Sequence, residues 1–163
     1  MTIKKYSQEA HKFSGYKEGD YPYYALPEEI GEFYGKIAKL KRGDYEYSEN
    51  LRIEILKELG DICWFVNEIC ILKNIELSIF KNWKRDINIQ EHFENLLIFQ
   101  VDLFQASNKK IYDLQSSVKT IMVAFSEIAQ YYNSSLPKIL AMNIRKLKDR
   151  KKRGVIQGDG DNR

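Results

Sequence analysis

The stretch EEIGEF, residues 28–33, and the stretch KELGD, residues 57–61, each carry two acidic residues three positions apart. The two pairs are Glu29 with Glu32 and Glu58 with Asp61. Residues three apart in a helix lie on one face, so each pair turns two carboxylates to the same side. Acidic side chains are common on solvated helix surfaces, and the chemistry therefore depends on which face each pair occupies.

Helical periodicity places Glu58 inside an apolar face. At about 100° per residue, five apolar side chains fall within about 60° of it; they are Leu51, Ile55, Ile62, Phe65 and Ile69. Asp61 falls at the edge of this face, Glu29 at the margin of the apolar face of the preceding helix, and Glu32 one step further out. A buried carboxylate needs neutralisation, hydrogen bonds or a metal ion. Two adjacent antiparallel helices carrying these pairs would form an all-oxygen site of the kind that Mg²⁺ prefers.

The rest of the chain predicts an all-α fold. Apolar periodicity and helix-end signals predict helices near residues 5–13, 27–41, 49–73, 89–113, 115–133 and 137–151. Pro27 suits a first helical turn, and Ser48 or Asn50 suits an N-cap. We expect one domain over residues 1–153, an antiparallel helical bundle of about four to five helices, followed by an irregular C-terminal tail over residues 154–163.

Composition limits the class of protein. The chain has 163 residues, of which 44% are hydrophobic and 30% charged. No apolar run approaches the ~20 residues of a membrane span, and the N-terminus lacks the apolar centre of a signal peptide. Cys63 and Cys70 would lie about 10 Å apart on one helix, too far for a disulfide. We expect a cytoplasmic protein with two reduced core thiols.

Positive charge is concentrated near the C-terminus. The net charge is +3, and seven of the nine residues in 145–153, RKLKDRKKR, are Lys or Arg. Residues 1–144 hold 18 basic and 20 acidic residues. This run predicts an anionic partner. One alternative is therefore a helical module that binds nucleic acid or a protein partner through residues 145–153, but it leaves the acidic pairs unexplained.

The acidic pairs resemble the signature of a known family. E-x-x-E, a spacer of 25 residues and E-x-x-D resemble the motif of the MazG-like nucleotide pyrophosphohydrolases, in the all-α NTP pyrophosphatase superfamily. Three further stretches are similar to that family: KKYSQEAHKF, ELGDICWFV and NIRKLKDRKKRGVIQGDGDNR. Together they cover about residues 1–75 and 134–163. Residues 82–120 have no counterpart in the shortest members and match the extra helical hairpin of longer ones. Phe65 stands where many members of this family have Tyr.

The resemblance implies hydrolysis of a nucleoside triphosphate, ribo or deoxy, between the α and β phosphates. The implied cofactor is Mg²⁺, with Mn²⁺ as an alternative, and the implied metal ligands are Glu29, Glu32, Glu58 and Asp61. Glu29 or Glu32 would also activate water. The candidate phosphate-binding residues are Lys36, Lys146, Arg150 and Arg153, and the candidate substrate contacts are Asn143 and Phe65. The family also implies a homo-oligomer, a dimer or a tetramer.

Simpler roles remain open for several of these residues. Lys36 could pair with Glu32 along one helix, and residues 145–153 could be a solvated helix end. Trp64 is expected in the core, and a base pocket is one hypothesis for Tyr21, Tyr23 and Tyr24. His11 and His92 have no matching partners and are expected to be structural. A nucleotide sensor without turnover is a third function, disfavoured by the complete set of four acids. We do not expect nucleic-acid or membrane binding.

A weak internal repeat relates the two halves of the chain. WFVNEICILKNIELSIF aligns with VAFSEIAQYYNSSLPKIL at an offset of 59 residues, which pairs Glu68 with Glu127. At this offset Glu58 and Asp61 correspond to Ser117 and Thr120. If the hairpin is duplicated, the second copy lacks the acidic pair, although helical periodicity alone produces matches of this kind.

Overall fold

The computed structural model describes residues 1–80, 88–105 and 111–155. These residues form six α-helices and one 3-10 turn, with no strand among them, which confirms the all-α prediction. The helices are α1 (Ile3–Ala10), α2 (Tyr21–Arg42), α3 (Glu49–Leu72), α4 (Ile89–Gln105), α5 (Ile111–Tyr131) and α6 (Leu136–Arg153), and the 3-10 turn is His11–Phe13.

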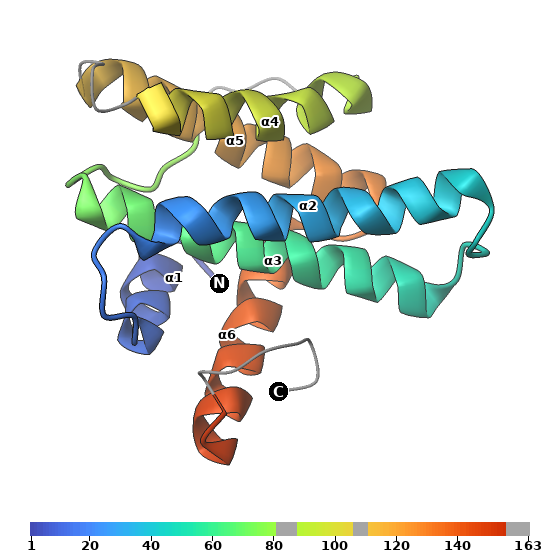
Figure 1. Ribbon diagram of the computed structural model, residues 1–163, viewed down its shortest axis with the longest axis horizontal. Helices are drawn as coiled ribbons and strands as arrows, with labels where there is room; N and C mark the ends of the chain where they lie inside the picture. The colour runs from blue at the N-terminus through green and yellow to red at the C-terminus, as the bar shows by residue number, and fades with distance from the viewer. Residues whose placement is uncertain (81–87, 106–110, 156–163) are drawn as a thin grey trace.

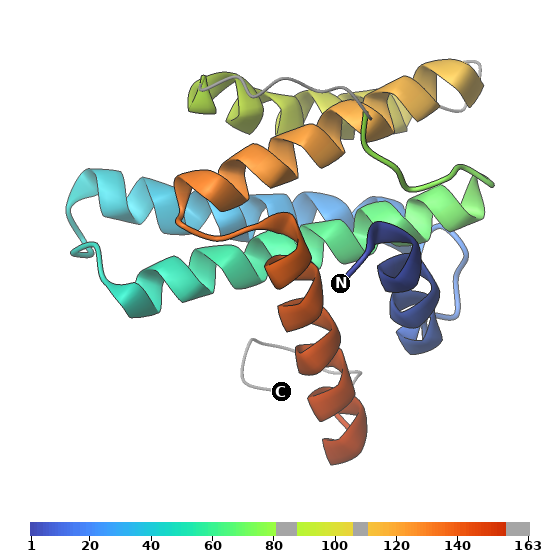
Figure 2. The same cartoon turned by 180° about the vertical axis from the view of Figure 1, so that it is seen from behind.

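The helices are arranged around a central antiparallel pair, α2 and α3 (Figure 1). A second antiparallel hairpin, α4–α5, lies on one side of this pair, and α1 and α6 lie on the other (Figures 1 and 2). α1 is near the end where α2 begins, whereas α6 starts against the middle of α3 and runs away from it. The predicted bundle is thus two antiparallel hairpins, and α6 does not run along either of them.

α2 begins six residues earlier than predicted. Pro22, not Pro27, occupies the first turn, and Pro27 lies inside the helix. Proline lacks an N–H, so Pro27 removes one backbone hydrogen bond, but a 22-residue helix packed along α3 tolerates this loss. Gly43 ends α2 with a φ of 87°, a left-handed conformation in which glycine has no steric penalty. The earlier start brings Tyr21 into the same helix as Glu29.

α3 is the core helix of the molecule. The Ser48 hydroxyl accepts a hydrogen bond from the Leu51 N–H at 3.2 Å and fixes the start of the helix, as predicted. Most residues of its C-terminal two thirds are buried, because α2, α5, α6 and α1 all contact it. Cys63 and Cys70 are buried free thiols, as expected of core cysteines.

The second hairpin differs from its predicted boundaries. The predicted helices 89–113 and 115–133 are observed as α4, ending at Gln105, and α5, beginning at Ile111. The sequence between them contains Ser107 and Asn108, which favour helix ends over helix interiors, and this signal was outweighed by the apolar periodicity. The C-terminal part of the predicted tail, residues 156–163, lies outside the described residues, and Gly154 ends α6 with a φ of 73°.

The α4–α5 hairpin has hydroxyl groups where the α2–α3 hairpin has acids. Ser117 and Thr120, the positions aligned with Glu58 and Asp61, line an outer groove of about 240 Å³ with Asp102. The Ser117 hydroxyl donates to Asp102 Oδ2 at 2.6 Å.

None of the helices in the described part of the chain is both long enough and apolar enough to cross a membrane.

Candidate active site

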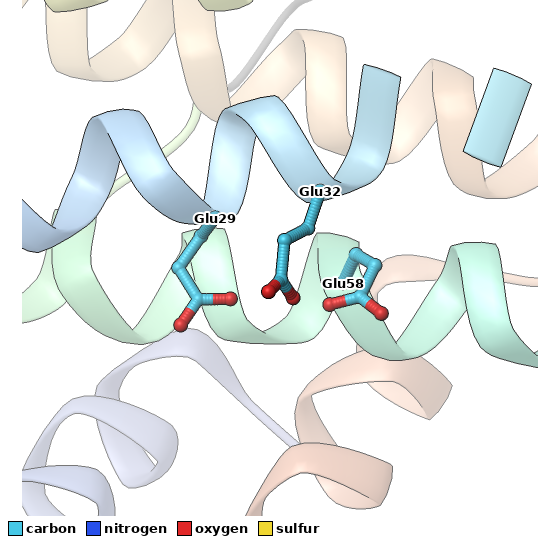
Figure 3. A group of neighbouring side chains, drawn as sticks. All are labelled: Glu29, Glu32 and Glu58. Atoms are coloured by element: carbon cyan, nitrogen blue, oxygen red, sulfur yellow. The ribbon is translucent and has the colours of Figure 1, made fainter. Parts of the chain in front are cut away.

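Three carboxylates converge between α2 and α3. Glu29 and Glu32 come from α2 and Glu58 from α3, and one oxygen of each lies within 4.8 Å of the others. Figure 3 shows the three side chains directed toward one another across the helix pair. Glu58 is 4% exposed, Glu29 is partly buried and Glu32 is exposed. This burial order is the one predicted from the helical faces.

Burial and repulsion alter the acidity of Glu29. Partial burial, followed by the nearby charges of Asp61, Glu32 and Glu58, raises its pKa to about 8, although the Lys146 ammonium acts in the opposite direction. The ionised form is disfavoured because it adds negative charge to a site that already holds several carboxylates. A carboxyl group whose pKa is raised this far beside other acids marks a candidate functional site.

Lys36 links the two helices at one end of the cluster. Its Nζ lies 3.2 Å from Glu58 Oε1 and 3.6 Å from Glu54 Oε2, and its side chain is 19% exposed. The charge of Lys36 thus compensates acids on α3. A role limited to pairing with Glu32 along α2, which the sequence left open, is excluded by this geometry.

Asp61 is held by α6 instead of joining the three glutamates. The Lys146 ammonium forms a close ion pair with Asp61 Oδ2, and Asn143 Nδ2 donates to Asp61 Oδ1 at 2.9 Å. Asn143 is itself fixed, because its Oδ1 accepts from the Tyr6 hydroxyl at 2.9 Å. We expected all four acids to converge; Glu29, Glu32 and Glu58 do so, and Asp61 is instead paired with α6. Asp61 remains close enough to raise the pKa of Glu29.

A cationic cavity includes Lys146, the partner of Asp61, in its lining. It has a volume of about 380 Å³, opens between α3 and α6, and is lined by five basic side chains: Lys57, Arg145, Lys146, Arg150 and Arg153. Lys146, Arg150 and Arg153 recur on one face of α6 at helical spacing, so they point to α3 together. Lys57 and Arg145 were not among the predicted phosphate-binding residues. For Lys57, its position next to Glu58 in the sequence could have indicated that it lies near the site.

Arg150 is the least ordinary of these cations. It is 9% exposed, and its side chain makes no hydrogen bond or ion pair with any other described residue. Arg153, by contrast, donates to Asp149 Oδ2 at 2.8 Å. Because Arg150 lines this cavity, an anion that entered the cavity could pair with its guanidinium. The cavity therefore has the chemistry of an anion site, with Arg150 already placed for a ligand such as phosphate.

The donor set fits a hard divalent cation. Glu29, Glu32 and Glu58 supply carboxylate oxygens at one point, and oxygen donors are the ligands that Mg²⁺ and Mn²⁺ prefer. A dication at that point would also relieve the repulsion that raises the pKa of Glu29.

Aromatic residues close the end of the site nearest α1. Phe65 is 6% exposed and packs edge-on against Tyr21 and Trp64, with ring centroids 5.9 and 4.8 Å away. Trp64 Nε1 donates to the Ala10 carbonyl at 3.2 Å, and the residue is core, as expected. Tyr23 is partly buried, whereas Tyr21 and Tyr24 are 44% and 68% exposed.

A partly buried contact between His11 and Glu68 at this end was not predicted from the sequence. The sequence left His11 without a partner, yet its Nδ1 lies 2.9 Å from Glu68 Oε2. The two residues are 57 positions apart, so no local pattern could join them. His92 is 5% exposed, in keeping with a structural role.

A segment of 51 residues, 31% of this chain, is 41% identical to the Gene 37 protein of Mycobacterium phage L5. The match covers 45% of that protein, less than half its length. No protein-family model matches the chain, and no solved structure matches it.

Proposed function

We propose that the protein is a MazG-like pyrophosphohydrolase that cleaves a nucleoside triphosphate, ribo or deoxy, between the α and β phosphates. The products are a nucleoside monophosphate and inorganic pyrophosphate (diphosphate). One observation supports this most directly: three carboxylates from two helices converge within 4.8 Å, and Lys146, which pairs with Asp61, also lines a cavity with five cations. Carboxylates alone repel a polyphosphate, and cations alone lack a base, so the combination suits metal-assisted phosphate chemistry.

Glu29, Glu32 and Glu58 would hold Mg²⁺, with Asp61 as a fourth ligand once Lys146 moves to substrate. When bound, Mg²⁺ neutralises phosphate oxygens and lowers the pKa of a coordinated water, and Mn²⁺ supplies the same chemistry. Lys36 would remain beside Glu58 and limit the net negative charge of the site. Asn143, fixed by Tyr6, orients Asp61.

Glu29 is our candidate general base. With a dication bound beside it, the Glu29 carboxylate would be ionised and could accept a proton from the attacking water. The water oxygen forms a bond to the α phosphorus, and the bond from that phosphorus to the bridging oxygen breaks. The electron pair leaves with the diphosphate. Glu32, more exposed on the same helix, is the alternative base left open by the sequence.

The cationic cavity would hold the β and γ phosphates. Lys146, Arg150 and Arg153 face α3 along one side of α6, and Lys57 and Arg145 complete the lining. These groups stabilise the charge that develops on the leaving diphosphate. The buried position of Arg150 favours a small anion over an extended nucleic-acid strand, and so favours this function over the nucleic-acid-binding alternative for residues 145–153.

The test is pyrophosphate release from a panel of nucleoside triphosphates with Mg²⁺ or Mn²⁺. Glu58→Gln and Asp61→Asn are expected to reduce the rate about a hundredfold or more, because each would remove a carboxylate ligand of the metal ion. Glu54→Gln is the matched control, since Glu54 is exposed and one turn from Glu58. Circular dichroism would verify that the variants are folded. Full activity in Glu58→Gln would refute the proposal.

A further inference from the structure

The faces that carry the acids continue into aromatic residues toward α1. Tyr21 and Glu32 differ by about 20° around α2, as do Phe65 and Glu58 around α3. Tyr21 precedes Glu29 by about 12 Å along α2. Figure 1 shows α1 below this end of the helix pair and α6 below its middle. A ligand with phosphates at α6 and the carboxylates would therefore extend its other end toward Tyr21 and α1.

Tyr21 is connected to a buried carboxylate through Tyr16. The rings of Tyr16 and Tyr21 lie 5.6 Å apart, and the Tyr16 hydroxyl donates to Glu68 Oε2 at 3.0 Å. Glu68 is fully buried and also accepts a hydrogen bond from Asn67 Nδ2 at 3.2 Å. His11 Nδ1, 2.9 Å from Glu68 Oε2, is the third group on this carboxylate. These contacts hold the imidazole and the Tyr16 hydroxyl on the same Glu68 oxygen, and the Tyr16 ring in turn lies against the Tyr21 ring.

The contact with Glu68 determines what His11 offers to a ligand. A carboxylate accepts hydrogen bonds, so Nδ1 carries the proton, and in the neutral ring Nε2 is an acceptor. The His11 side chain is 49% exposed, and the structure shows no contact of Nε2 with another described residue.

We infer that His11 is a specificity-determining residue whose Nε2 accepts a hydrogen bond from an exocyclic amino group of the substrate base, while the base lies against the Tyr21 ring. This inference rests on the proposed function, since it places the base of the same nucleotide. An oxo group at the same position of the base presents an acceptor to an acceptor, and this arrangement forms no hydrogen bond. Glu68 is the positioning residue, because it sets the tautomer of His11 without touching substrate.

The experiment compares dCTP with dUTP, two pyrimidine nucleotides that differ by an amino and an oxo group on one edge. For the unmodified protein, kcat/KM is expected to favour dCTP by about tenfold, the effect of one neutral hydrogen bond. His11→Phe removes the acceptor and should abolish the preference. His11→Gln keeps an acceptor near the Nε2 position and should retain part of it. Lys12→Gln, an exposed neighbour outside this contact, is the control.

A further variant, at Glu68, distinguishes a loss of nucleotide preference from a general loss of activity. Glu68→Gln keeps the shape of the side chain but no longer fixes the His11 tautomer, so the ratio of the two kcat/KM values should fall while the turnover of dUTP is retained. The inference is overturned if both nucleotides are hydrolysed without preference, or if the preference survives in His11→Phe. In either case the hydrolase proposal stands. If no nucleotide is hydrolysed with Mg²⁺ or Mn²⁺, both the function and the inference are wrong.

Discussion

Glu29 is a residue of the candidate site whose acidity is strongly altered. Its pKa of about 8 is raised from an ordinary value of 4.5 by partial burial and by neighbouring acids, Asp61 first. Between these two values the unfolded chain loses the proton while the folded protein keeps it. The free energy of unfolding of the metal-free protein should therefore fall as pH rises through this window.

Glu29→Gln tests that expectation. The substitution should raise the free energy of unfolding by about 1–2 kcal/mol at alkaline pH and have little effect near about pH 5. Thermal melting in the presence of a chelator measures it, and the shift is about 2–4 °C per kcal/mol for a chain of this size. Parallel pH profiles for the two proteins would contradict the expectation.

Sequence reasoning identified residues that share a helix and missed those that meet through tertiary packing. The buried position of Glu58 and the partly buried position of Glu29 follow from angles around single helices, and both are confirmed. The pairing of Asp61 with Lys146 and of His11 with Glu68 joins residues 85 and 57 positions apart. Such pairs depend on how helices pack, which periodicity within one helix does not encode.

At the scale of elements, the contact between α3 and α6 positions the site. A methyl group built on Gly60 would lie 3.2 Å from Asn143 Cβ, so the glycine permits the close approach of the two helices. Asn143 is buried and hydrogen-bonded to both Tyr6 and Asp61, and it has little freedom to move.

Gly60→Ala should lower the free energy of unfolding by about 1–3 kcal/mol, because overpacking outweighs the gain in helix propensity. Gly35→Ala is the matched control in α2. Nothing lies within 4 Å of its added methyl group, and this variant should gain about 0.5–1 kcal/mol. Denaturant titration distinguishes the two. Equal stabilisation of both variants would show that α6 does not need the close contact.

Helix types were predictable, whereas some helix ends were not. Long apolar periodicities at 49–73 and 137–151 correspond closely to α3 and α6. The start of α2 was misplaced because Pro22 and Pro27 are both compatible with a first turn, and only packing against α3 shows which proline lies inside the helix. The junction of α4 and α5 was misplaced because apolar residues continue across weak helix-ending signals.

Across the whole molecule, the site draws on α2, α3 and α6, with α1 at one end, whereas none of the described residues of the α4–α5 hairpin belongs to it. Mg²⁺ with an uncleavable nucleoside triphosphate analogue should therefore slow amide hydrogen exchange in α1, α2, α3 and α6 and leave the solvent-facing side of α4 unchanged. Glu58→Gln, mixed with the same ligands, provides the control. Protection confined to α4–α5 would place the ligand elsewhere.

The homo-oligomer, dimer or tetramer, stays a prediction at this scale. The outward face of α4 exposes Leu97, Ile98 and Val101 by about half. Sedimentation velocity of the full chain measures the oligomeric state directly.

The ammonium groups of Lys36 and Lys146 have a consequence for the metal-free protein. They already neutralise Glu58 and Asp61, so the fold does not require a bound metal ion. Small zinc domains, in contrast, unfold when their metal is removed. Removal of the metal ion by a chelator would therefore abolish the proposed activity while the protein stays folded. Resupply of the cation would revive it within the time of a diffusional encounter, since no refolding intervenes.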